Sequence, residues 1–507
     1  MKGAVPQRRP EQGLSAAQET ELKLALSAED AHDLHRREFA RARVHHLVSV
    51  YYDTPDRRLL KAGLTVRLRS DGDRWVQTVK DEGLGLTRFE DEASVKGAAL
   101  DLERLGRGPV ANLIEGAVLE PVFETRVLRR IQRIRVGEAA IELALDQGEV
   151  VAGEARLPLA ELELELKSGE ASALFSEARR FIETTGASVS LVTKAERGQA
   201  LAAGRAGRPV KFRPPRLRRE MSCREAFQAL AFAAVRQLQA NVLLPEGGDA
   251  IEAAHQARVS LRRLRATLSA FKAMLSDDRR EAVEAELKRL TGIFATARTL
   301  DVFIAETFQP FADADAGSAE FGRALLQAQA EAHAQVRADT AARDYRMAVL
   351  EALEWISVGP WTWNATTRSL AERPIATLAP DLLDHRRRAM RKRGGRLDWR
   401  DPLPRHRLRI QAKKMRYLAE AFAPLCGDAK AFVEALQVFL DLAGRLNDIA
   451  GAPAAAALAL SPTLSQDAVF AAGRLVGERR TEEHRLIRKA RKAFEGFESE
   501  PPFWRTR

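Results

Sequence analysis

The chain has 507 residues, more than one ordinary hydrophobic core serves, so two or three domains are expected. Its only two cysteines, Cys223 and Cys426, exclude a disulfide framework and a cysteine-rich zinc site. The net charge of +11 favours anionic partners, while aromatic content of 6% argues against nucleic acid bound by base stacking. Because no apolar stretch is as long as a membrane span, we expect a cytoplasmic protein without one.

Residues 16–200 read as short strands separated by turns. Asp71-Gly72 and Gln147-Gly148 lie at turns between alternating runs, as in β-hairpins. At least seven such runs predict a mostly antiparallel sheet that is closed or strongly curved. Helices are expected at Ala28–Ala42 and Ser172–Thr184.

Three of these strands have one charged face. Side chains alternate along a strand, so Glu19, Glu21 and Lys23 share a face, and Glu161–Lys167 repeats the pattern. The strand Leu64–Arg69 presents bases instead. A solvated sheet face explains any one of them, but three in one region favour carboxylates that hold a divalent metal beside bases that hold phosphate.

The candidate residues form an acidic and a basic set. No glycine-rich phosphate loop, H-E-x-x-H helix or G-x-S-x-G elbow is present, so phosphates would be held by side chains and metal. The acids are Glu19, Glu21, Glu142, Asp146, Glu163 and Glu165, and the bases are Lys23, Arg67, Arg69, Lys80, Arg88 and Arg129.

A basic connector at 205–218, with prolines at 209, 214 and 215, separates this region from a second one. From Cys223 onward the apolar residues recur with helical periodicity, which Pro360 interrupts near the middle. This half of the chain is therefore predicted to be helical.

The helical half contains an internal repeat. Two segments share the spacing of one histidine and several bases, which places the histidine and three bases of each copy on one helical face. The first copy is His255, Arg258, Arg262 and Arg265, and the second is His406, Arg409, Lys413 and Arg416. Each copy is followed by a shorter repeated motif, R-x-x-D, at Arg298–Asp301 and at Arg445–Asp448, and we call these two motifs the echoes. A solvated basic face remains an alternative, but two copies favour an anion-binding surface on a duplicated helical bundle.

At this point the sequence resembles two known families. Glu19–Lys23 (E-T-E-L-K) resembles the ExExK signature of the triphosphate tunnel metalloenzymes, the CYTH family. The resemblance continues in order through Y-Y-D-T-P, Q-T-V-K, A-L-D-Q-G, E-L-E-L-E-L-K-S-G and T-K-A-E-R-G. The helical half resembles the CHAD domain, whose histidine–arginine motifs bind polyphosphate. This domain order is typical of bacterial inorganic triphosphatases.

The resemblance implies an α+β domain at 16–204 with a closed eight-stranded antiparallel β-barrel, or tunnel, and flanking helices. The linker would span 205–218, and an all-α duplicated bundle would span 219–500. It also implies roles for the residues. The catalytic set is Glu19, Glu21, Lys23 and Lys80; the metal ligands are Glu19, Glu21, Asp146, Glu163 and Glu165; the triphosphate ligands are Lys23, Arg67, Arg69, Lys80, Arg88, Arg129 and Lys194. The spacing leaves open which of Glu161, Glu163 and Glu165 face the metal.

The expected function is hydrolysis of inorganic triphosphate with Mg²⁺ or Mn²⁺, coupled to polyphosphate binding by both histidine–arginine copies. The alternatives are a tunnel enzyme acting on thiamine triphosphate or ATP, an adenylate cyclase, and a non-catalytic polyphosphate binder. The expected location is the cytoplasm, in association with polyphosphate granules. The sequence does not indicate an oligomeric state.

Overall fold

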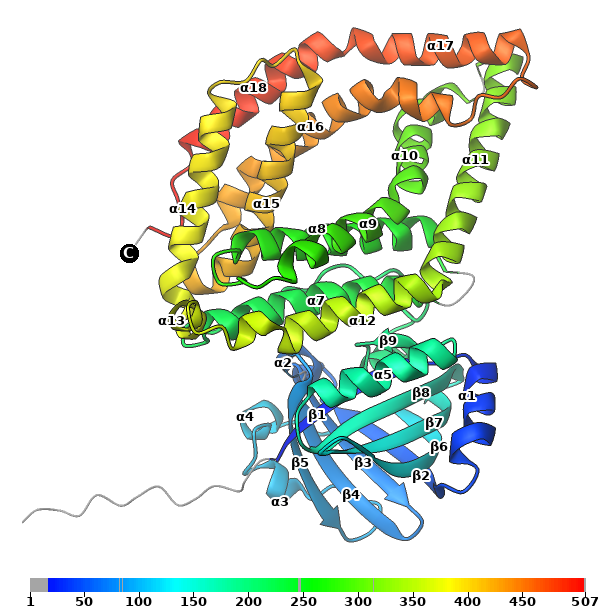
Figure 1. Cartoon of the computed structure of the whole chain (residues 1–507), viewed down its shortest axis with the longest axis vertical. Coiled ribbons are helices and arrows are strands. Elements are labelled where there is room, and N and C mark those ends of the chain that lie inside the picture. The colour runs from blue at the N-terminus through cyan, green and yellow to red at the C-terminus, as the bar shows by residue number, and fades with distance from the viewer. Residues whose placement is uncertain (1–16, 82, 84, 245–247, 313, 506–507) are drawn as a thin grey trace, which may run out of the picture. The chain divides into compact units, whose positions relative to one another are not determined.

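The computed structural model describes residues 17–81, 83, 85–244, 248–312 and 314–505 (Figure 1). The described part of the chain forms two compact units. The barrel unit contains the residues up to Ala178 together with Thr193–Ala206, and the helical unit contains Arg179–Val192 and the residues from Gly207 onward. The domain limits proposed from the sequence stay predictions.

The barrel unit is a closed antiparallel β-barrel, as predicted. Its strands follow the order β5-β4-β3-β2-β6-β7-β8-β1, and β1 pairs with β5 to close it. The strands are β1 (Ala17–Ala25), β2 (Arg43–Asp53), β3 (Leu64–Asp71), β4 (Arg74–Asp81), β5 (Thr87–Val95), β6 (Glu120–Val136), β7 (Ala139–Ala152) and β8 (Ala155–Ser168).

Successive side chains of a strand point to opposite faces of the barrel wall, which explains how the barrel buries both apolar and charged side chains. In the register of β1 with β8, Leu22 lies opposite Leu164 and Lys23 lies opposite Glu163. The leucines are fully buried on one face of the barrel wall, and the charged residues line the other. An apolar exterior covered by other elements therefore surrounds a charged interior.

One end of the barrel interior is apolar and is closed by helix α6 (Lys194–Ala202). Leu201 of α6 packs with Tyr51, Phe123 and Val150, which lie on the inward-facing rows of β2, β6 and β7. A capping box formed by Thr193 and Glu196 begins the helix. The α6 end is therefore the closed end of the interior, and we call the opposite end the open end.

The remaining helices that begin in the barrel unit lie outside the strands. They are α1 (Ala28–Leu34), α2 (Arg58–Ala62), α3 (Leu102–Leu105), α4 (Ala111–Ile114) and α5 (Ser172–Thr184). The prediction for α5 is correct, but a continuous helix over Ala28–Ala42 is wrong. The α-helix ends at Leu34, and a π-turn over His35–Phe39 brings Leu34 and Phe39, five residues apart, to the same buried side.

Apart from the short strand β9 (Ser188–Ser190), the elements of the helical unit are helices, which confirms the predicted class. They are α7 (Cys223–Val242), α8 (Ala250–Ala270), α9 (Arg280–Ile293), α10 (Ala295–Phe303), α11 (Ala316–Ala341), α12 (Arg343–Val358), α13 (Arg368–Glu372), α14 (Ile375–Gly394), α15 (Pro402–Cys426), α16 (Lys430–Ala457), α17 (Gln466–Thr481) and α18 (Glu483–Ser499). In the part of the chain described here, none of these is long and apolar enough to cross a bilayer.

The repeat found in the sequence falls on matching helices. The two histidine–arginine copies lie on α8 and α15, which contact each other, and the two echoes lie on α10 and α16, which also contact each other. The predicted break at Pro360 is a single 3₁₀ turn after α12. The duplicated helices therefore bring corresponding segments together.

Gly198 is predicted to be required for the closure of the barrel by α6. A Cβ at this position would lie 2.0 Å from two ring atoms of Phe123. Gly198→Ala should lower the free energy of unfolding by about 1–3 kcal/mol, measured by chemical denaturation. Gly477→Ala, in a helix with no atom near the added Cβ, is the control and should be neutral or stabilising. Equal stability of the two variants would contradict close packing of α6.

Candidate functional site

The charged residues predicted from alternating strands converge in the barrel interior. They come from β1, β3, β4, β5, β6, β7 and β8, and Lys194 reaches in from α6. The predicted residues found there are Glu19, Glu21, Lys23, Arg67, Arg69, Lys80, Arg88, Arg129, Asp146, Glu163, Glu165 and Lys194.

Three carboxylates form an inner acidic group near the closed end: Asp146, Glu161 and Glu163. Each can place an oxygen within 4.8 Å of the other two. The Lys194 ammonium lies among them, 2.7 Å from Asp146, 2.5 Å from Glu161 and 2.9 Å from Glu163. Arg129 adds ion pairs of 2.6 Å to Asp146 and 2.5 Å to Glu163.

These cations keep the inner acidic group ionised. Burial alone raises the pKa of Asp146, but Arg129 and Lys194 hold that pKa below its usual value. Burial likewise raises the pKa of Glu163, but Lys194, Lys23 and Arg129 bring it well below the usual range. The inner acidic group is thus compensated by the protein's own cations.

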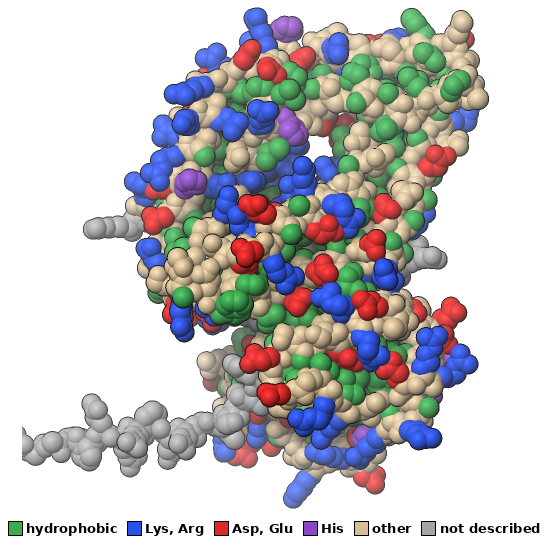
Figure 2. Space-filling view, in the orientation of Figure 1, with side chains coloured by type: hydrophobic (Ala, Val, Ile, Leu, Met, Phe, Trp, Pro, Cys, Tyr) green, Lys and Arg blue, Asp and Glu red, His purple; other side chains and the backbone are tan. Residues whose placement is uncertain are grey.

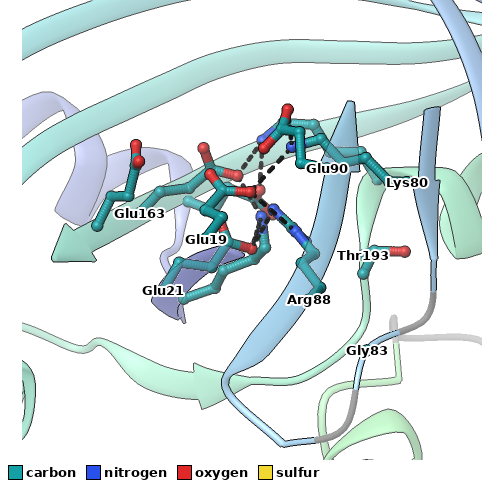
Figure 3. Close-up of polar contacts among 12 residues, drawn as sticks. Glu19, Glu21, Lys80, Gly83, Arg88, Glu90, Glu163 and Thr193 are labelled. Carbon is teal, nitrogen blue, oxygen red and sulfur yellow. Dashed lines mark hydrogen bonds and ion pairs between the residues drawn. The ribbon is translucent and has the colours of Figure 1, made fainter. Parts of the chain in front are cut away.

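A second set of contacts surrounds the carboxylates of β1 (Figure 3). The Arg88 guanidinium bridges them, with Nε donating to Glu19 at 3.0 Å and Nη2 lying 2.5 Å from Glu21. Lys80 Nζ donates to Glu19 at 3.1 Å and lies 2.8 Å from Glu90. Strands β1, β4 and β5 therefore join acids and bases at one place, as the sequence predicted for all but Glu90.

Glu165 is in a different electrostatic environment. Its carboxylate pairs with Lys167 at 2.6 Å. Burial raises the pKa of Glu165, and the carboxylates of Glu19 and Glu142 raise it further despite Lys167. Like charges therefore lie near one another here, in contrast to the inner acidic group.

Arg67 and Arg69 form a basic pair on β3. Both lie against Glu92, with Nη2 to Oε1 distances of 3.4 Å and 3.3 Å. Arg67 is the main cause that lowers the pKa of Arg69 to about 10, followed by burial. Arg67 Nε is buried without a hydrogen-bond partner among the described residues. Two crowded guanidinium groups with spare N–H donors suit the oxygens of a phosphate chain.

The sequence analysis did not select four acids of the interior, which are Asp71, Glu90, Glu92 and Glu161. Glu90 and Glu92 follow Arg88 at period two in R-F-E-D-E, so the alternation that selected Arg88 also indicates them. Glu161 was left open, and it lies in the inner acidic group with no exposed surface. Its burial depends on α6, for which the strand pattern gives no signal.

The two histidine–arginine copies meet in the helical unit, where they form what we call the cationic cluster. The charge of Arg262 on α8 lowers the pKa of Arg409 and of Lys413 on α15. The charge of Arg298 on α10 likewise lowers the pKa of Arg258 on α8. The cluster consists of His255, Arg258, Arg262, Arg298, Arg409 and Lys413. Lys and Arg side chains also gather over α14 and α15 in the surface view (Figure 2).

Crowding shifts the protonation of this cluster. Burial and then Arg298 lower the pKa of His255 to about 4, so its imidazole is neutral near pH 7. Burial, followed by Arg262, Arg409 and Arg416, lowers the pKa of Lys413 to about 6. Asp448 on α16 counters these cations only in part.

Some predicted residues of the helical repeat have partners of their own. Arg416 lies 3.3 Å from Glu420, and His406 Nδ1 lies 2.5 Å from Asn447 Oδ1. The echoes diverge as well, since Asp301 binds His333 at 2.9 Å and Asp448 faces the cluster. The repeat is therefore not functionally symmetric. Arg265 remains in the basic surroundings of Arg262.

Comparison with known proteins agrees with this geometry. Residues 17–198 match the CYTH domain family and residues 229–457 match the CHAD domain family. An inorganic triphosphatase of Haemophilus influenzae is 29% identical over 197 residues, which are 36% of this chain and 55% of that protein. The match thus spans about half the length of that relative.

Two solved structures are also similar. The CHAD domain of the plant Ricinus communis is 24% identical, with a TM-score of 0.50, over 58% of this chain and 97% of that one, which shows the fold of the helical unit. A candidate adenylyl cyclase from Hippeastrum, described as having a dominant triphosphatase activity, is 19% identical with a TM-score of 0.28 over 37% of this chain and 96% of that one. The chain therefore contains a CYTH domain followed by a CHAD domain.

Proposed function

We propose that the barrel unit hydrolyses inorganic triphosphate to pyrophosphate and phosphate with Mg²⁺ or Mn²⁺. The observation that carries this proposal is the closed interior, in which acids of β1, β7 and β8 face bases of β3, β4, β5 and β6. The CYTH match and the inorganic triphosphatase relative support it.

The basic residues of the interior would bind and orient the phosphate chain. Phosphoryl transfer depends on charge neutralisation and in-line positioning more than on covalent catalysis, so no nucleophilic side chain is needed. Burial, followed by Arg88 and Arg67, lowers the pKa of Lys80, which shows how closely the cations crowd. A bound polyanion would relieve this repulsion, and these cations would neutralise its oxygens.

The acids of the interior fit a hard divalent cation, which prefers carboxylate oxygens. Of the ligands expected from the sequence, we assign the metal to Glu19, Glu21 and Glu165, because Glu21 lies directly opposite Glu165 and Glu165 lies near like charges that such a cation would neutralise. Asp146 and Glu163 instead hold Arg129 and Lys194 in place. The inner acidic group, with oxygens within 4.8 Å of one another, is the alternative metal site. When bound, the metal would supply positive charge to the phosphate and activate a water molecule.

Other triphosphates remain rival substrates. ATP, thiamine triphosphate and cyclisation of ATP all use the same triphosphate contacts, and a non-catalytic binder would use the same bases. Carboxylates that only held bases in place would suit a pure anion binder as well, so the catalytic proposal depends on Glu19, Glu21 and Glu165, which would hold the metal. Turnover of triphosphate, ATP, thiamine triphosphate and long-chain polyphosphate by the purified full chain separates these functions.

We further propose that the helical unit binds inorganic polyphosphate at the cationic cluster. Arg258, Arg262, Arg409 and Lys413 repel one another, and Asp448 compensates them only partly. Uncompensated cations that come from several helices favour an extended polyanion as the missing counterion. Binding of this kind would associate the protein with polyphosphate granules in the cytoplasm.

Glu21→Gln is expected to lower triphosphate turnover about 100-fold or more, because it removes one carboxylate charge from the metal site and from Arg88. Phosphate release is measured while Mg²⁺ is titrated. Glu154→Gln, at an exposed turn, is the matched control and should keep wild-type activity. Full activity of Glu21→Gln, or of the wild type in excess EDTA, would contradict the mechanism.

Replacement of Arg262, Arg409 and Lys413 by glutamine is expected to weaken polyphosphate binding about 100-fold or more. Because these substitutions remove charges that repel one another, they should not destabilise the helices, and the helicity of the variant should match that of the wild type. The control replaces the exposed Lys288, Arg323 and Arg337, which removes the same number of basic side chains. Equal affinity in the two variants would show that the cluster is structural, and triphosphatase activity should be unchanged in both.

Polyphosphate affinity is expected to fall as pH rises above about 6, because of Lys413. A polyanion favours the charged ammonium, so binding takes up a proton wherever free Lys413 is neutral. The groups facing Lys413 are Arg262, Arg409, Arg416, Asp448 and His255. Polyphosphate affinity is expected to fall by up to about tenfold for each pH unit. Calorimetry in two buffers of different ionisation enthalpy measures the number of protons taken up on binding. The Lys413→Arg variant stays charged, so it should show no such uptake. If the uptake were the same in this variant, the assignment to Lys413 would be contradicted.

A further inference from the structure

Three acids, Asp71, Glu92 and Glu142, lie towards the open end of the barrel interior, where Arg133 and Lys167 pair with Glu142. Strands β3 and β5 run towards this end and β7 begins there, since each is antiparallel to its neighbours. Asp71 lies two residues beyond Arg69 on one row, Glu92 lies two beyond Glu90, and Glu142 lies four before Asp146. We call these three residues the acidic rim.

Exposure confirms this order along the barrel. The side chain of Glu92 is 41% exposed and that of Asp71 is 38% exposed. Glu142 is 17% exposed, whereas Asp146, on the same strand but deeper, has no exposed surface. Along each of these strands the rim acid is therefore more exposed than the charged residues deeper on the same row, and Glu92 is more exposed than Arg67 and Arg69, at 14% and 21%.

Among the rim acids, Glu92 contacts the basic pair of β3. Its Oε1 is shared by Arg67 and Arg69, and it also accepts a hydrogen bond from Thr78 Oγ1 at 3.1 Å. Thr78 in turn accepts a hydrogen bond from Arg67 at 3.1 Å. One carboxylate thus fixes the separation of two guanidinium groups.

The other two rim acids are engaged elsewhere. Asp71 pairs with His45 at 2.6 Å, and Glu142 pairs with Arg133 at 2.9 Å. Burial alone would raise the pKa of Glu92, but Arg69 and Arg67 lower it, so this carboxylate stays ionised. Glu92 therefore keeps a negative charge beside the arginines that would hold phosphate.

The length of a bound phosphate chain is limited at the other end by α6. Leu201 of α6 with Phe123 and Val150 closes that end with apolar groups, and Lys194 lies beside them among the carboxylates of the inner acidic group. A chain with more phosphate units than the basic residues accommodate must extend towards the open end. Its additional units would then meet the acidic rim.

We propose that Glu92 positions Arg67 and Arg69 for the outermost phosphate of the substrate and limits chain length by repelling any further unit. This inference rests on the proposed triphosphatase function and deepens it by naming a specificity residue. Glu92 acts through the arginines and through its charge, so it is a positioning residue and not a catalytic one.

Two variants of the full chain separate the two effects of Glu92. Glu92→Gln keeps the size and an acceptor for the arginines but removes the charge, and Glu92→Asp keeps the charge but shortens the reach. The assay compares kcat and KM for inorganic triphosphate and inorganic tetraphosphate. Glu154→Gln, exposed at a turn, is the matched control for loss of one carboxylate charge.

For Glu92→Gln we expect the ratio of kcat/KM for tetraphosphate to that for triphosphate to rise about tenfold. For Glu92→Asp the ratio should stay close to that of the wild type, while kcat for triphosphate falls. An unchanged ratio in Glu92→Gln, with active wild type, would overturn the inference alone. A wild type that hydrolyses neither substrate would instead overturn the proposed function.

Discussion

The barrel interior depends on one physical constraint: a charge withdrawn from water must meet an opposite charge. Removing one partner of a buried pair costs several kcal/mol, because the remaining charge is left uncompensated. Glu163 satisfies this constraint with Lys23, Arg129 and Lys194 together. The acidic strand faces can therefore be buried only opposite the basic ones, and closure of the barrel brings the two kinds of face together.

The helical unit departs from that balance. In the cationic cluster the positive charges of Arg262, Arg409 and Lys413 repel one another. Asp448 compensates them only weakly, because burial raises the pKa of its carboxyl group. Keeping such repulsion is unfavourable for stability, so a ligand that neutralises it binds with a matching gain. On the functions proposed above, the two units would recognise phosphate chains by different means. The barrel interior compensates its own charges and would hold a metal, whereas the cationic cluster is left uncompensated.

Alternation alone predicts which face each strand residue occupies, and it correctly placed the acids and bases of β1 and β3 together. The same rule extends to Glu90 and Glu92, which were missed although their signal is present. Lys194 is different, because its contacts require α6 to fold across the end of the barrel. Likewise the sequence shows that Arg262 and Arg409 belong to equivalent repeats, but only helix packing decides that they form one cluster.

The order of residues along the barrel axis follows from strand register, which no single strand reveals. Because strands in a closed barrel are staggered, residues directly paired across neighbouring strands lie at different heights. The observed register places Phe123 and Val150 at the closed end, whereas Glu92 of β5 lies across Thr78 of β4 from Arg67 of β3, with its side chain more exposed than that of Arg67. Neither an apolar end nor an acidic rim stabilises an anion. If the interior binds a phosphate chain as proposed, the extent of the basic residues between these two ends would limit the length of that chain.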